Sequence, residues 1–81
     1  MTKEEVIDVI KKHIMDNLED LEEEDINPAK SMRDYGADSL DIIEVVSCSM
    51  RELKIKIPRA ELADIQTIGQ LADKFVEHMN S

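Results

Sequence analysis

Apolar side chains recur at three- and four-residue steps through most of this chain, and that spacing limits the fold more than any other feature. It is the spacing of one face of an amphipathic helix. A first stripe consists of Ile7, Ile10, Ile14, Leu18 and Leu21. A second consists of Leu40, Ile43, Val46, Met50 and Leu53. A third consists of Ile68, Leu71, Ala72, Phe75 and Met79. Three helices are therefore predicted, and a chain of 81 residues has room for them in one domain, residues 1–81.

Local signals indicate where these helices begin and end. Thr2 with Glu5, and Thr67 with Gln70, have the spacing of a capping box, in which side chains satisfy the backbone of a helix start. Asp38 is a good N-cap for a helix over 39–53. Six of the seven residues from 19 to 25 are acidic, so their mutual repulsion should end the first helix near this run.

Two connectors join the predicted helices. The first, residues 22–37, is long enough to need anchoring, for which the candidates are Ile26, Met32 and Tyr35. The second, residues 54–58, alternates like a strand but has no second strand to pair with, so we expect an extended link that stops at the proline.

A short helical turn over 59–63 should follow, with Leu62 and Ile65 pointing inward. The expected fold class is all-α. It is a small bundle of three main helices plus one short helix, with a long loop between the first two main helices.

Charge and composition exclude several classes of function. The chain has 19 acidic and 10 basic side chains, a net charge of −9, which is the wrong sign for nucleic acid or an anionic membrane surface. No apolar run approaches the roughly 20 residues of a membrane-spanning helix. We expect a cytoplasmic monomer whose partners are basic proteins.

Side chains for catalysis or metal binding are not grouped in the sequence. His13 and His78 lie near opposite ends of the chain, and Cys48 is the single cysteine. No base lies near Ser39 in sequence to activate it as a nucleophile. The acidic run at 19–25 lacks the pattern of a calcium-binding loop, which favours a solvated surface over a weak divalent-cation site. We therefore expect neither catalytic residues nor metal ligands.

Ser39 is the remaining candidate for chemistry. It lies in the first turn of the second predicted helix, where outward N–H groups and the helix dipole favour an attached phosphate. Asp-Ser-Leu alone is a common tripeptide, so Ser39 on this evidence is either a polar first-turn residue or a point of attachment.

The surroundings of Ser39 carry more information than the tripeptide. Residues 36–41 read Gly-Ala-Asp-Ser-Leu-Asp, midway along an acidic helical chain and ahead of a helix that ends near an Ile-Pro pair. In these features the sequence resembles the acyl carrier protein family over essentially its whole length. The resemblance implies that Ser39, flanked by Asp38 and Leu40, carries 4′-phosphopantetheine. A phosphopantetheinyl transferase adds this arm from coenzyme A, and its thiol holds acyl groups as thioesters.

A carrier also needs a docking surface and room for its cargo. Negative charge beside the arm would guide encounters with basic partners, and Ile42 and Val45 widen the apolar stripe enough to suggest a second contact. The expected partner-binding residues are Asp38, Leu40, Asp41, Ile42, Glu44, Val45 and Arg59. The expected lining of an acyl slot is Ile43, Val46, Met50 and Ile65.

The stretch from 49 to 73 resembles a narrower group, the free-standing carriers of β-branching cassettes in polyketide synthase clusters. The resemblance implies an acetyl unit, made by decarboxylation of a loaded malonyl group and delivered to an HMG-CoA-synthase-like enzyme. A ketosynthase-type decarboxylase and an acyltransferase are the other implied partners. The alternatives are a type II fatty acid carrier, a general polyketide or aminoacyl carrier, an unmodified interaction module, and a calcium-responsive protein.

Two features depart from fatty-acid carriers. Ser47, Cys48 and Ser49 stand where larger apolar residues are usual, so they either shrink the slot or lie on a wet face, and Cys48 is expected to be inert. Residues 51–59 hold four basic side chains and one acidic one, a local charge of +3. This basic patch either contacts an acidic partner or offsets repulsion within the domain.

Overall fold

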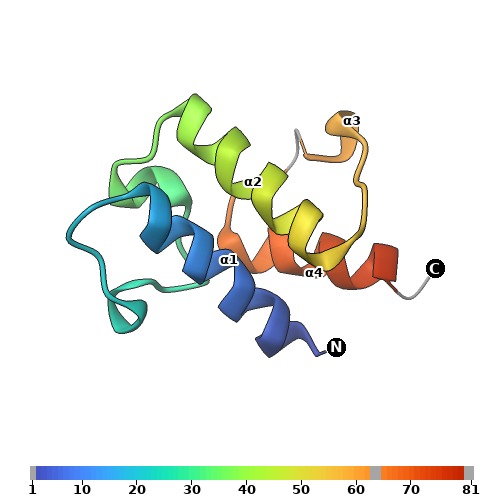
Figure 1. The fold of residues 1–81 in the computed structure, drawn as a ribbon, viewed down its shortest axis with the longest axis horizontal. Coiled ribbons are helices and arrows are strands. Elements are labelled where there is room, and N and C mark those ends of the chain that lie inside the picture. Colours follow the sequence, from blue (N-terminus) through green and yellow to red (C-terminus); the bar gives the residue numbers. More distant parts are fainter. Residues whose placement is uncertain (1, 63–64, 80–81) are drawn as a thin grey trace.

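The computed structural model describes residues 2–62 and 65–79, with Arg59 described by its backbone alone (Figure 1). The described residues form four α-helices and two 3-10 turns and contain no strand, which confirms the all-α prediction. In chain order the elements are α1 (Lys3–Asn17), η1 (Glu23–Asp25), η2 (Met32–Tyr35), α2 (Ser39–Leu53), α3 (Arg59–Leu62) and α4 (Ile68–Met79).

Helix α1 packs against both α2 and α4 and is the centre of the core. Its fully buried side chains are Val6, Ile10 and Ile14, four residues apart and so on one face. Two of them belong to the predicted stripe. Its other members, Ile7, Leu18 and Leu21, pack on the edge of the core and are only partly buried.

Helix α2 buries only part of the predicted stripe, in which Val46 is buried and Met50 and Leu53 pack against the core. The buried residues are Val45, Val46 and Ser49, whereas Leu40 is 76% exposed and Ile43 is 48% exposed. The prediction that Leu40 and Ile43 face the core was wrong, because the apolar arc of α2 is wide enough for either of two faces to be buried. Ser49 is tolerated inside because its hydroxyl donates a 2.7 Å hydrogen bond to the carbonyl oxygen of Val45.

The predicted helix starts are confirmed. The Thr2–Glu5 capping box is complete in α1, and Asp38 caps α2 through a box with Asp41. Thr67 and Gln70 exchange the same pair of hydrogen bonds at the start of α4. Helix α1 ends at Asn17, just before the acidic run.

The long loop is anchored as expected, and also in a way that the sequence did not suggest. Ile26 and Met32 are buried, and the hydroxyl of Tyr35 accepts a 2.6 Å hydrogen bond from the Asn27 N–H. In addition, the carbonyl oxygens at positions 30 and 28 accept hydrogen bonds of 3.0 and 2.8 Å from the first two N–H groups of α4, at positions 68 and 69. The loop therefore caps α4.

The chain after α2 follows the predicted path. Lys54 ends α2 in the left-handed conformation, and the extended link that follows buries Ile57. Helix α3 is the expected short turn. The predicted last residue of that turn, Ala63, lies outside the described residues.

Gly36 gives a direct test of how the loop delivers the chain to α2. Its φ is +89°, and a methyl group added there would meet nothing within 4 Å, so the cost of a substitution is conformational. We expect Gly36→Ala to lower the free energy of unfolding by about 1–2 kcal/mol. Gly36→Asn should cost less, because asparagine tolerates the left-handed region. Urea unfolding measures both, and equal midpoints for the two variants would contradict the argument.

Candidate functional site

Ser39 is the first residue of α2, and its side chain is exposed. The cap beside it is reciprocal: the Asp41 N–H donates to Asp38 Oδ1 at 2.9 Å, and the Asp38 N–H donates to Asp41 Oδ2 at 3.2 Å. These bonds fix the backbone on both sides of Ser39. Its hydroxyl is therefore held at a defined place on the surface, open to solvent.

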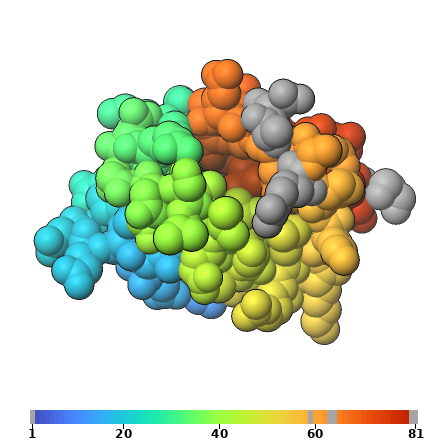
Figure 2. Space-filling model, turned by 90° about the horizontal axis from the view of Figure 1, so that it is seen from above, coloured from blue at the N-terminus to red at the C-terminus, as the bar shows by residue number. Residues whose placement is uncertain are grey.

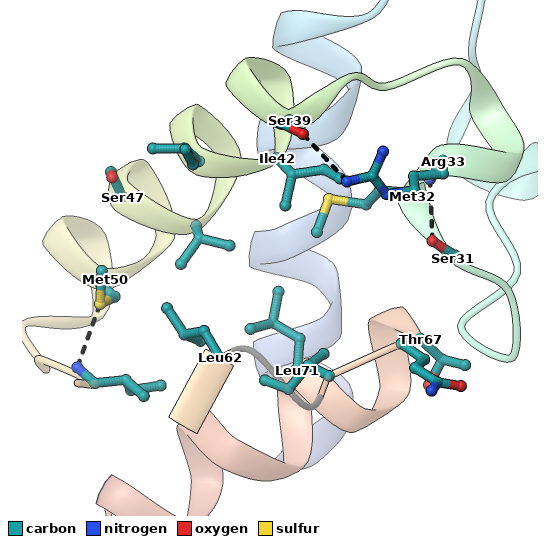
Figure 3. A pocket seen from close by; sticks show the side chains of 15 residues that line it. Ser31, Met32, Arg33, Ser39, Ile42, Ser47, Met50, Leu62, Thr67 and Leu71 are labelled. Carbon is teal, nitrogen blue, oxygen red and sulfur yellow. Dashed lines mark hydrogen bonds between the residues drawn. The ribbon is translucent and has the colours of Figure 1, made fainter. Parts of the chain in front are cut away.

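Arg33 comes to Ser39 from the turn that precedes α2. Arg33 Nη2 donates a 3.2 Å hydrogen bond to Ser39 Oγ (Figure 3). Ser31 starts this turn by accepting a hydrogen bond from the Arg33 N–H, and Gly36 ends it in the left-handed conformation. Arg33 was not predicted from the sequence. Its one signal was the three-residue spacing of Ser31 and Asp34, which form the capping box of η2.

A cavity of about 720 Å³ lies beside Ser39, within the range of small-molecule sites. Figure 2 shows the surface hollowed between the green-to-yellow α2 and the orange segments that precede α4. The apolar side chains that line it are Met32, Ile42, Ile43, Val46, Met50, Ile57, Leu62, Ile65 and Leu71. The polar ones are Ser31, Arg33, Ser39, Ser47, Gln66 and Thr67.

All four residues expected at an acyl slot, Ile43, Val46, Met50 and Ile65, line this cavity. The sulfur of Met50 also accepts a 3.3 Å hydrogen bond from the Ile57 N–H, which joins α2 to the extended link at the cavity wall (Figure 3).

The small residues in mid-helix divide between different environments. Ser47 lines the cavity, Ser49 lies in the core, and Cys48 is half-buried with its sulfur 3.6 Å from Glu44 Oε1. Neither expectation, a smaller slot or a wet face, therefore describes all three residues.

The residues expected at a partner surface also separate. Asp38, Leu40 and Glu44 are exposed, whereas Asp41 and Ile42 are half-buried and Ile42 faces the cavity. Val45 is 1% exposed and belongs to the core, so its assignment to the partner surface was wrong. The side chain of Arg59 lies outside the described part of the chain. Leu40 and Ile43, both exposed, form an apolar spot in the first turns of α2.

Both histidines contact glutamates and do not line the cavity. His13 Nε2 lies 2.9 Å from Glu52 Oε1 and joins α1 to α2, while His78 Nε2 lies 3.2 Å from Glu61 Oε1 and joins α4 to α3. Hydrogen bonding to Lys12, and then to His13, holds the pKa of the Glu52 carboxyl below its usual value.

Within residues 2–62 and 65–79, no three His, Cys, Asp or Glu side chains are grouped so that they could hold a metal ion. None of the helices in that part is both long and apolar enough to span a membrane.

Known proteins with similar sequences support a single family. Residues 8–75 match the phosphopantetheine attachment site family. The polyketide biosynthesis acyl-carrier-protein AcpK of Bacillus subtilis is 31% identical over 81 residues, 100% of this chain and 99% of that protein. An acyl carrier protein of Clostridium perfringens is 33% identical over 73 residues, 90% of this chain and 96% of that protein.

A solved structure has the same fold. It is a chain in the crystal structure of the curacin biosynthetic pathway HMG synthase in complex with acetyl donor-ACP, with a TM-score of 0.75 and 40% identity. The match covers 93% of this chain and 96% of that one. With its helical bundle, exposed serine at the start of α2 and adjoining cavity, this chain belongs to the phosphopantetheine-binding acyl carrier protein family.

Proposed function

We propose that Ser39 carries the 4′-phosphopantetheine arm and that the protein donates acetyl units for β-branching in polyketide biosynthesis. The observation that carries the proposal is the place of Ser39, exposed at the start of α2 and beside a cavity of about 720 Å³. The arm supplies a thiol that holds an acyl group as a thioester. The residues around Ser39 determine whether the arm can be attached and where it begins.

Those residues fit the arm. In the attachment step, Ser39 Oγ forms a bond to the pantetheine-side phosphorus of coenzyme A as the phosphorus–oxygen bond to adenosine 3′,5′-bisphosphate breaks. The hydroxyl proton is released to solvent. Ser39 needs only to be accessible and fixed for this transfer, because the phosphopantetheinyl transferase supplies the catalysis. The capping box of Asp38 and Asp41 fixes it.

The surface around Ser39 is suited to transient basic partners. Asp38, Asp41 and Glu44 place negative charge next to the hydroxyl, and Leu40 and Ile43 add exposed apolar area. Charge of this kind acts mainly on the rate and orientation of encounter, which a carrier that visits several enzymes requires. The proposed partners are the transferase, an acyltransferase, a ketosynthase-type decarboxylase and an HMG-CoA-synthase-like enzyme. On the resemblance alone, we retain Arg59 in this surface.

The cavity lining offers hydroxyl groups as well as apolar contacts, which suits a polar acyl group. Its floor and walls are mostly apolar, but the hydroxyls of Ser47 and Thr67 also line it. A carbonyl or carboxylate oxygen of an acetyl or malonyl group could therefore find a donor there, which an alkyl chain cannot use. One relative supports this cargo, since the solved structure at 40% identity contains an acetyl donor-ACP.

The first test is attachment itself. Incubation with a promiscuous phosphopantetheinyl transferase and coenzyme A should add one phosphopantetheine group to the wild-type chain. Ser39→Ala should add none, because no hydroxyl remains at the start of α2. Ser47→Ala, which removes another hydroxyl that lines the cavity, is the matched control and should be modified fully. Intact-mass spectrometry reads all three, and a modified Ser39→Ala chain would exclude Ser39 as the attachment point.

The second test separates the acetyl donor from a general carrier. The acetyl-loaded protein should transfer its acetyl group to an HMG-CoA-synthase-like enzyme of a β-branching cassette at least tenfold faster than an acetyl-loaded fatty-acid carrier does. A tenfold ratio corresponds to about 1.4 kcal/mol of preference, within the reach of a few surface contacts. Equal rates would leave the carrier role intact and remove the case for specialisation.

Cys48 does not compete with the arm as a thiol. Burial, followed by the nearby Glu44 carboxylate, raises the pKa of its thiol above the usual value. Since only the thiolate is a strong nucleophile, Cys48 should react slowly near neutral pH.

This gives a third test, by alkylation of the modified protein with iodoacetamide. The arm thiol should be alkylated several-fold faster than Cys48 at pH 8, since burial and the Glu44 carboxylate raise the pKa of the Cys48 thiol. Glu44→Gln should speed the reaction of Cys48, because it removes a negative charge that disfavours the thiolate. Peptide mapping by mass spectrometry distinguishes the two thiols. Equal alkylation rates at both would contradict the prediction that Cys48 is the less reactive one.

A further inference from the structure

We infer that Arg33 binds the phosphate of the arm and positions the root of the arm at the mouth of the cavity. The inference rests on attachment at Ser39, and it adds a residue that neither the sequence motif nor the family match identifies. Arg33 is six residues before Ser39, in η2, on a different element from the serine.

The geometry places a cation at the atom that would carry phosphorus. Arg33 Nη2 already lies 3.2 Å from Ser39 Oγ, and Figure 3 shows its side chain extending from η2 toward the start of α2. A phosphodiester formed on that oxygen places two non-bridging oxygens, which share one negative charge, two bonds from the same atom. The guanidinium has five N–H donors in a planar fork, so it can contact these oxygens without leaving its present place.

Arg33 is free to take this role. The ion pairs among the described residues use lysines and histidines and do not involve it. Asp34, the adjacent acid, is engaged in the capping box of η2, where its Oδ2 accepts a 3.0 Å hydrogen bond from the Ser31 N–H. The present acceptor of Arg33, a neutral exposed hydroxyl, is a weak partner compared with a phosphate anion.

The acidic surroundings of Ser39 favour a basic side chain at position 33. The protein has a net charge of −9, and Asp38 and Asp41 flank Ser39 on the helix. A phosphodiester adds one more negative charge at this crowded place, so an adjacent guanidinium offsets repulsion that would otherwise oppose the modified state.

The backbone of Arg33 is fixed well enough for it to position a ligand. Its N–H donates to Ser31 Oγ at 3.1 Å, and its carbonyl oxygen accepts from the Gly36 N–H at 3.1 Å. The neighbouring Met32 is buried in the core. Arg33 and Ser39 both line the cavity. A phosphate that is attached to Ser39 and bound by Arg33 therefore keeps the start of the arm at the cavity mouth.

The test compares fully modified proteins that differ only in one basic side chain. Wild type, Arg33→Gln and Arg33→Lys are converted with coenzyme A and a transferase, and conversion is checked by intact mass. Arg51→Gln is the matched control, since it removes the same charge at an exposed position of α2 away from the cavity lining. Two quantities are measured at low and high salt: the phosphorus-31 chemical shift of the phosphodiester, and the difference in Tm between modified and unmodified protein.

In Arg33→Gln, we expect the phosphorus-31 resonance to shift from its wild-type position. The Tm difference between modified and unmodified protein should fall by about 1–8 °C, the range for one exposed charge pair in a domain of this size. Arg33→Lys should restore part of both effects, because it keeps the charge but not the fork. Arg51→Gln should match wild type. High salt should move the wild-type resonance toward that of Arg33→Gln, which tests the contact without any substitution.

The outcomes separate the two proposals. If the wild-type chain gains no arm, attachment at Ser39 and the role of Arg33 both fail. If the arm is added but Arg33→Gln and Arg51→Gln give the wild-type phosphorus shift and the wild-type Tm difference, attachment stands and the role of Arg33 is excluded.

Discussion

Two backbone hydrogen bonds join the long loop to the start of α4, and the site depends on them. They run from the N–H groups of Ile68 and Gly69 to the carbonyl oxygens of Lys30 and Pro28. A loop of this length would otherwise be free to move relative to the helices. With its middle fixed on α4, the turn η2 is placed beside the start of α2, and the loop and α4 together form one side of the cavity. The same bonds satisfy N–H groups at a helix start that no intrahelical acceptor can reach.

Helix α2 performs two tasks with adjacent residues. Val45 and Ser49 lie in the core, while Ile42, Ile43 and Met50 face the cavity. This explains why its apolar arc is wider than a small bundle requires. A helix that is apolar on one narrow stripe can be buried but cannot also form the wall of a cavity, and a carrier needs both in one element.

The sequence predicted local features well because their causes are local. The caps at Thr2, Asp38 and Thr67 each need partners only three residues away, and all were found as expected. The face of α2 was misjudged because periodicity gives the width of an apolar arc and not which side the other helices cover. For this reason Leu40 was placed in the same apolar stripe as Val46, and Val45 was assigned to the partner surface, whereas Leu40 is exposed and Val45 is buried.

The same reasoning explains why Arg33 could not be found in advance. Its contact with Ser39 requires η2 to lie against the start of α2, and that placement comes from the burial of Met32 and the ties to α4. Ser39 itself was predicted from its neighbours in sequence. The cavity lining was predicted in part: Ile43, Val46, Met50 and Ile65 were expected, but the contributions of η2 and the extended link depend on tertiary packing.

Gly69 has a consequence for anyone who recombines carrier proteins. A methyl group at this position would lie 3.2 Å from the carbonyl oxygen of Pro28, closer than most such contacts, and that oxygen already accepts the Gly69 N–H. Residue 69 and the turn at 28 are therefore matched in shape, although 40 residues separate them. A chimera that exchanges the loop without the first turn of the last helix would pair a loop and a helix start whose shapes do not match. The loop and that helix turn should therefore be transplanted together.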